Sequence, residues 1–162
     1  MRLTDLSDME LYFHLVRLQA EYVQCIDDDR LETWPDFFTD PCVYRIVPRE
    51  NSDRGLPLAA LSCDSRGMLV DRVVSLRHAN IYGVHYYRHL TGELRVLARD
   101  AESVSVQSHY AVFQTRGDGT TSIYQTGKYL DRVVVDQGAL RYREKLAVFD
   151  TYRIDSLLVR PI

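Results

Sequence analysis

The chain has 162 residues, of which 46% are hydrophobic and 27% are charged, and its formal net charge is −3 at pH 7. These values are typical of a globular domain that buries roughly 70% of its unfolded surface, so we expect residues 1–162 to form a single domain. Acidic and basic residues are interleaved, whereas nucleic-acid-binding surfaces are clustered and basic. No apolar run approaches the ~20 residues of a membrane span, and the acidic first ten residues do not resemble a secretory signal. We therefore expect a cytoplasmic protein that binds neither nucleic acid nor membrane.

The three cysteines, Cys25, Cys42 and Cys63, are odd in number and widely spaced. No C-x-x-C pair is present, so neither a zinc site nor a redox dithiol is expected. Free, buried thiols in a reducing compartment are the expected state.

The first predicted helix runs from about Asp8 to Ile26. Ser7 and Glu10 have the spacing of a capping box, in which each side chain binds a backbone N–H of the other residue. Apolar residues then recur on one helical face, at Leu11, Leu15, Leu18 and Tyr22. Three aspartates, residues 27–29, follow at the end where carboxylates oppose the helix dipole. They form either a solvated turn or a place where one carboxylate faces a pocket.

A short helix or turn is expected over residues 31–38, where Trp34, Phe37 and Phe38 would pack the first helix onto a sheet. Residues 42–47 alternate and are β-prone, which predicts a first strand that stops at Pro48. Residues 49–57 are polar and rich in turn formers, which predicts a loop.

A second long helix is expected to begin with Asp64 as its N-cap and to end between Asn80 and Gly83. Leu69, Val73 and Leu76 mark its apolar face. The six residues after Val84, H-Y-Y-R-H-L, then read as a loop that enters a strand.

His85 and His89 are four residues apart. On a helix they would share a face, as metal ligands need, but on a strand they would lie about 13 Å apart, which is too far to share one metal ion. The other interpretation is a polar, aromatic surface that contacts another chain, since tyrosine and arginine are enriched at interfaces.

The second half predicts a meander of strands at residues 93–98, 102–115, 122–135 and 140–150, with turns at 117–119 and 136–138. In the last strand, simple alternation places Tyr142 and Lys145 on opposite faces. The chain ends in an apolar segment that needs something to pack against. Helices followed by a long meander indicate an α+β fold with helices on one face of a curved sheet.

Seven short motifs occur in a characteristic order. They are W-P-D-F-F-T at 34–39, Tyr44-Arg45, Gly55-Leu56, D-S-x-x-M-L-x-D-R at 64–72, L-R-x-A-N-I-Y at 76–82, Tyr87-Arg88-His89, and L-L-x-x-P-I at 157–162. With this element order, the chain resembles the small (β) subunits of Rieske-type aromatic-ring-hydroxylating oxygenases. Within that family it looks most similar to the small subunits of terephthalate dioxygenase and salicylate 5-hydroxylase. The resemblance implies a nuclear-transport-factor-2-like (cystatin-like) cone, with N-terminal helices packed on a long, curved, mostly antiparallel sheet.

The resemblance further implies a non-catalytic subunit of a dioxygenase that acts on an aromatic acid, terephthalate in the first instance. The large (α) subunit would hold the Rieske [2Fe–2S] cluster and the mononuclear Fe(II), the assembly would be α3β3, and a reductase would act on it. A Rieske cluster needs two cysteine and two histidine ligands, and here no cysteine lies within two residues of a histidine. A 2-His-1-carboxylate iron site could be drawn from the five histidines, but no pair has family support. We therefore expect no catalytic, cofactor-binding or metal-binding residue on this chain.

The residues that the resemblance singles out become structural or interface candidates. Asp71, Arg72 and Arg88 are expected to form ion pairs or hydrogen-bonded anchors, since a desolvated arginine must be paired. Tyr86, Tyr87 and His89 are expected to face the large subunit or another small subunit. Pro161 and Ile162 are expected to pack against the core or a neighbour.

Two other functions stay open. The cone also occurs in stand-alone isomerases, dehydratases and hydrolases, and here Asp27 or Asp28 with His89 or His109, assisted by Tyr44, would supply the acid/base pair. A homo-oligomeric binding module without a partner is the third possibility. An enzyme turns over alone and a module binds its ligand alone, whereas a small subunit does neither.

Overall fold

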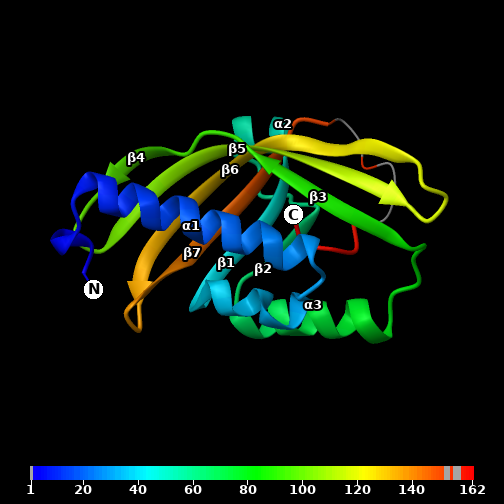
Figure 1. Cartoon of the computed structure of the whole chain (residues 1–162), viewed down its shortest axis with the longest axis horizontal. Coiled ribbons are helices and arrows are strands. Elements are labelled where there is room, and N and C mark those ends of the chain that lie inside the picture. Colours follow the sequence, from blue (N-terminus) through cyan, green and yellow to red (C-terminus); the bar gives the residue numbers. More distant parts are fainter. Residues whose placement is uncertain (1, 152–153, 155–157) are drawn as a thin grey trace.

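The computed structural model describes residues 2–151, 154 and 158–162. Seven strands form one sheet in the order β2-β1-β7-β6-β5-β3, and β4 also pairs with β5 (Figure 1). β1 and β7 are parallel and every other pairing is antiparallel. The strands are β1 (Phe38–Pro48), β2 (Leu61–Cys63), β3 (His85–Thr91), β4 (Arg95–Arg99), β5 (Ser103–Arg116), β6 (Thr121–Asp136) and β7 (Ala139–Phe149).

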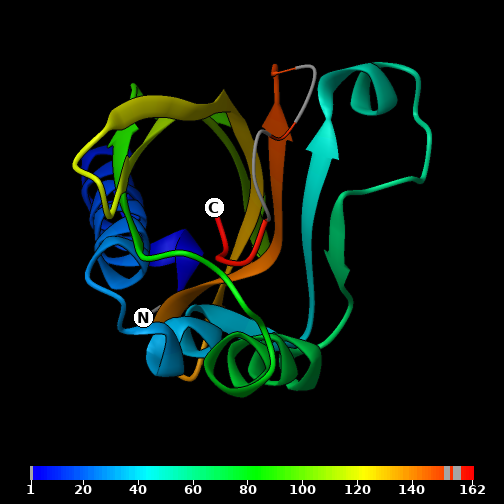
Figure 2. The same ribbon diagram turned by 90° about the vertical axis from the view of Figure 1, so that its right-hand side faces the viewer.

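Three α-helices, α1 (Asp8–Asp27), α2 (Arg49–Asp53) and α3 (Arg66–His78), and two 3₁₀ turns, η1 (Leu3–Asp5) and η2 (Leu31–Phe37), accompany the sheet. The sheet curls strongly and α1 lies across its open side, so that the two enclose a cone, which the last residues of the chain enter (Figure 2). The predicted α+β cone with helices on a curved sheet is confirmed.

The start of α1 follows from its capping box. The Ser7 hydroxyl accepts the Glu10 N–H at 3.3 Å, and the Ser7 N–H donates to the Glu10 carboxylate at 2.8 Å. The predicted apolar face is buried, with Leu11 and Leu15 each 2% exposed and Tyr22 fully enclosed. The helix is therefore set locally by its cap and globally by the apolar stripe.

The N-cap of α3 differs from the prediction. Ser65, not Asp64, is the N-cap, and its hydroxyl accepts one of the free N–H groups of the first turn, that of Met68, at 3.2 Å. Asp64 instead lies 3.3 Å from the Arg45 guanidinium on β1. Aspartate and serine are both good N-cap residues. In the structure the Asp64 carboxylate is paired with Arg45, and Ser65 caps the helix.

Two short elements were missed. α2 occupies part of the segment predicted to be a loop, and β2 pairs with β1 just before α3. β1 also begins at Phe38, four residues earlier than predicted.

β7 departs from the predicted alternation. Arg132 on β6 pairs with Glu144, and the next residue, Val133, pairs with Tyr142, so Arg143 is an extra residue in β7. Such a bulge reverses the facing of everything beyond it. Tyr142 and Lys145 consequently both point inward, at 2% and 0% exposure, which corrects the prediction of opposite faces.

Candidate functional site

Strand β3 divides the candidate residues between two environments. Successive side chains of a strand point to opposite faces, so His85, Tyr87 and His89 face the cone while Tyr86 and Arg88 face outward. Tyr87 is 1% exposed and His89 6%, whereas Tyr86 is 63% exposed. Tyr87 and His89 were predicted to be interface residues on the surface. That prediction is wrong, because strand alternation turns them into the interior.

Inside the cone, His89 binds Asp27, the last residue of α1. The ring Nδ1 of His89 lies 2.6 Å from one carboxylate oxygen of Asp27, and the His89 backbone N–H donates to the other at 2.9 Å. The His89 side chain has no exposed surface, and that of Asp27 is 4% exposed. The structure thus assembles one of the acid/base pairs that the sequence offered. The other two candidates, Asp28 and His109, are exposed.

The end of the chain fills the deep part of the cone. The Ile162 N–H donates to the Tyr44 hydroxyl at 2.8 Å, and the Ile162 main-chain oxygen accepts from Tyr22 at 2.8 Å and from Tyr44 at 3.1 Å. Ile162 is fully buried and Pro161 is also buried. Of the two places expected for Pro161 and Ile162, the core or a neighbour, the structure shows the core.

Arg72 anchors the same segment from outside, since its guanidinium donates to the Leu158 carbonyl at 2.6 Å. This confirms the hydrogen-bonded anchor predicted for Arg72. Asp71 and Arg88 are exposed, and within the described part of the chain neither forms an ion pair or hydrogen bond through its side chain. The partners expected for Asp71 and for Arg88, which include neighbouring subunits, are therefore not found among the described residues of the isolated chain.

A buried ion pair joins the neighbouring strands β6 and β7. The Lys145 ammonium donates to Asp131 at 2.9 Å and lies 3.8–4.5 Å from the ring centres of Tyr22, Tyr129 and Tyr142. Burial lowers the pKa of Lys145 and raises the pKa of Asp131, and each partner opposes the shift of the other. The alternation of residues in the sequence did not predict this pair, because the bulge at Arg143 changes which face Lys145 occupies and leaves no mark in the sequence pattern.

The outward face of β3 continues into an apolar surface. Arg88 pairs with Phe113 of β5, and Phe113 pairs with Ile123 of β6, which places these side chains on the outer face of the sheet. Tyr86 is 63% exposed, and Leu90 and Ile123 are each 58% exposed. We refer to Tyr86, Arg88, Leu90 and Ile123 as the outer patch.

The described residues contain no group of three histidine, cysteine, aspartate or glutamate side chains arranged to hold a metal ion. All three cysteines are free and buried, as predicted, and burial raises the pKa of the Cys42 thiol to about 11. No helix in the described ranges combines the length and apolar character needed to cross a bilayer.

The fold and sequence match known proteins along nearly the whole chain. Residues 8–145 match the SnoaL-like domain. The chain is 48% identical over 156 residues to the small subunit of anthranilate 1,2-dioxygenase of Burkholderia cepacia, covering 96% of this chain and 97% of the relative. It is 36% identical over 148 residues to a β subunit of the terminal oxygenase component of terephthalate 1,2-dioxygenase of a Comamonas species, covering 91% and 96% of the two chains.

A crystal structure of a β subunit assigned to an aromatic-ring-hydroxylating dioxygenase of Novosphingobium aromaticivorans DSM 12444 superposes with a TM-score of 0.86 at 46% identity, covering 94% of this chain and 97% of that one. The molecule is thus a SnoaL-like cone. More particularly, the chain belongs to the small (β) subunits of aromatic-ring-hydroxylating dioxygenases. The terephthalate subunits that the sequence pointed to are among its relatives, at lower identity than the anthranilate subunit.

Proposed function

We propose that this chain is a non-catalytic subunit that supports the large, iron-bearing subunits of a terminal oxygenase. The observation that carries the proposal is the similarity, over nearly the full length of both chains, to proteins named as small subunits of dioxygenases. The large subunits hold the Rieske [2Fe–2S] cluster and the mononuclear Fe(II), the assembly is α3β3, and a reductase supplies electrons. The expectation that this chain itself carries no catalytic, cofactor or metal residue is part of the proposal.

The outer patch is the surface that we assign to subunit contact. It combines exposed aromatic and aliphatic side chains with Arg88, which has no ion-pair partner among the described residues. Aromatic residues and arginine are enriched where interfaces bury side chains, and exposed apolar patches often mark such contacts. Asp71, on the outward side of α3, is a second exposed charge available to a neighbour.

Coexpression of this chain with its large subunit tests the patch. Arg88→Ala and Tyr86→Ser should lower the yield of the hetero-oligomer, while iron content and turnover per assembled complex stay unchanged. Arg54→Ala is the matched control, because Arg54 is also an exposed arginine and follows α2 on the far side of the molecule from β3 (Figure 2). Assembly that is equal for Arg88→Ala, Tyr86→Ser and Arg54→Ala would refute the assignment.

The substrate of the assembly is an aromatic acid. Both relatives carry the name of such an acid, anthranilate in one and terephthalate in the other, and the higher identity favours anthranilate. Because the substrate belongs to the large subunit in this proposal, the test is a turnover comparison of the two acids with the reconstituted complex and its reductase. Turnover of neither acid would refute the assignment of the substrate class.

A stand-alone acid/base enzyme is the second candidate, and one observation favours it. The Asp27–His89 pair has the 2.6 Å contact that proton transfer needs. However, the His89 side chain is fully enclosed, and the end of the chain occupies the cone. Purified chain that turns over cyclic or hydroxylated substrates without a partner, and loses that activity in Asp27→Asn, would replace the scaffold proposal.

A further inference from the structure

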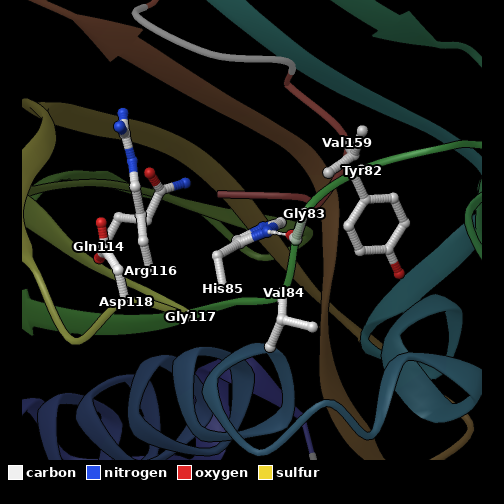
Figure 3. Close-up of a pocket in the computed structure, with 9 residues that line it drawn as sticks. All are labelled: Tyr82, Gly83, Val84, His85, Gln114, Arg116, Gly117, Asp118 and Val159. Carbon is white, nitrogen blue, oxygen red and sulfur yellow. Dashed lines mark hydrogen bonds between the residues drawn. The ribbon is translucent and has the colours of Figure 1, made fainter.

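A pocket of about 410 Å³ remains at the mouth of the cone (Figure 3). It lies between the start of β3, the hairpin that joins β5 to β6, and Val159. Its rim is held together by the Gly117 N–H, which donates to the Val84 carbonyl at 3.0 Å. This volume is within the range of small-molecule sites, roughly 300–1,000 Å³.

His85 is one of the polar residues that line this pocket, and its hydrogen-bonding state is defined by its neighbours. Its Nδ1 lies 2.8 Å from the Gly83 carbonyl, which can only accept, so Nδ1 carries the proton. Burial, with a contribution from Arg160, lowers the pKa of His85 below its usual value, so the ring is neutral at pH 7. Nε2 is then an acceptor, and it is buried without a hydrogen-bond partner among the described residues.

Two further polar side chains line the same pocket without being used elsewhere. Gln114 is 3% exposed, and its amide forms no hydrogen bond within the described part of the chain. Arg116 has no salt bridge in the same residues. Asp118 also lines the pocket; its carboxylate offsets part of the Arg116 charge and accepts the Thr120 N–H at 2.9 Å.

The remaining walls are apolar or aromatic. Tyr82 packs edge-on against the His85 ring at 5.5 Å, and Val84 and Val159 complete the lining. A ligand that satisfies all of these groups has a flat apolar body, a donor for His85 Nε2 and a negative charge for Arg116.

We propose that the mouth of the cone is a binding site for a small aromatic carboxylate that carries a hydroxyl or amino donor. The donor meets His85 Nε2, the carboxylate meets Arg116, the Gln114 amide takes the remaining polar contact, and the ring lies against Tyr82 and Val159. This site belongs to the small subunit itself. It does not depend on the scaffold role, because assembly with the large subunit is measured separately. Binding by the isolated chain would revise only the expectation that a small subunit binds no ligand alone.

The site is tested on the full chain without a partner, so that no large-subunit pocket competes. The probes are 2-, 3- and 4-hydroxybenzoate, with benzoate and phenol as ligands that lack the donor and the charge respectively. NMR titration should show saturable shifts of the His85 ring signals, while those of His14 on α1 stay fixed. At least one hydroxybenzoate should bind at least tenfold more tightly than benzoate or phenol.

Three variants in the pocket and one control outside it locate the binding. His85→Phe should weaken it at least tenfold and Arg116→Ala at least threefold, while Arg95→Ala, an exposed arginine outside the pocket, should not change it. Val84→Trp should abolish it by filling the pocket, and Val84 is 65% exposed, so this change does not disturb the core. No saturable binding, or equal affinity in wild type and Val84→Trp, would overturn the proposal even if His85→Phe failed to fold.

Discussion

Both oxygens of the Asp27 carboxylate are bound by one residue, His89, through its backbone N–H at 2.9 Å and its ring at 2.6 Å. Asp27 is the last residue of α1 and His89 is in the middle of β3, so this contact fastens the helix layer to the edge of the sheet. It also accounts for the orientation of β3, because the backbone contact holds the strand in the register that turns Tyr86 and Arg88 outward.

Asp27→Asn should lower the free energy of unfolding by about 1–3 kcal/mol, because it leaves buried polar groups of His89 poorly satisfied. Urea denaturation measures this loss. Asp28→Asn is the control, since Asp28 is exposed and forms only a weak ion pair with Arg30, at 3.6 Å. This substitution should lower the free energy of unfolding by less than about 0.5 kcal/mol. Equal effects of the two changes would contradict the structural role of the pair.

Lys145→Met should be more costly, about 3–5 kcal/mol, because it leaves the Asp131 carboxylate buried without its partner. The double change Lys145→Met with Asp131→Leu should recover most of that loss. Arg132→Met removes an exposed ion pair with Glu144 on the same two strands and should cost under about 1 kcal/mol. A Lys145→Met loss no larger than that of Arg132→Met would show that Lys145 is not enclosed.

Gly127 permits the close approach of β6 to β7. A Cβ there would overlap the Val148 carbonyl oxygen, so Gly127→Ala should shift the strands and cost more than about 2 kcal/mol. Gly67→Ala in α3 is the matched control. Its Cβ meets only the Ser65 hydroxyl at 3.7 Å, and the change should stabilise the protein by up to about 1 kcal/mol. Thermal unfolding distinguishes the two, and a neutral Gly127→Ala would contradict the close approach.

Alkaline pH should act through the buried tyrosines. Burial raises the pKa of Tyr22, Tyr44, Tyr87, Tyr110, Tyr129 and Tyr142 above the usual value of about 10. Because these pKa values are higher in the folded state, the stability they contribute is complete below pH ~10 and is lost as the pH rises through the folded values.

Phenolate absorbance measures this effect. Folded protein at pH ~11 should contain far less phenolate than protein in concentrated urea at the same pH, and it should unfold as the remaining tyrosines ionise. Equal phenolate in the folded and the urea-unfolded protein would contradict the burial of these rings.

Tyr44→Phe should loosen the end of the chain, because it removes a donor to the Ile162 oxygen and an acceptor for the Ile162 N–H. The expected loss is about 1–3 kcal/mol, with faster amide exchange in residues 158–162. Tyr86→Phe, on the outer patch, should leave both quantities unchanged. Unaltered exchange in Tyr44→Phe would mean that Tyr44 does not hold this segment.

Local patterns in the sequence predicted the long elements well. The Ser7 capping box and the apolar stripe of α1 define the helix with no knowledge of its neighbours. The curved sheet with helices on one face followed from the order of the predicted elements and from the resemblance.

Features that depend on distant contacts could not be predicted in the same way. The facing of β3 was open because residues 85–90 carry polar and aromatic side chains on both faces, so no hydrophobic pattern marks the inner one. The inward position of Lys145 depends on an extra residue at Arg143, and at the start of α3 Asp64 pairs with Arg45 of β1 while Ser65 caps the helix. From the sequence, Asp27 with His89 was one of several possible acid/base pairs. Only the packing of α1 against β3 shows that these two residues are in contact.

Native mass spectrometry with iron quantification, on this chain recovered gently from its source, tests the central claim most directly. The account predicts a hetero-oligomer with equal numbers of this chain and a larger chain, with all of the iron on the larger one. A metal-free homo-oligomer without a partner would contradict it.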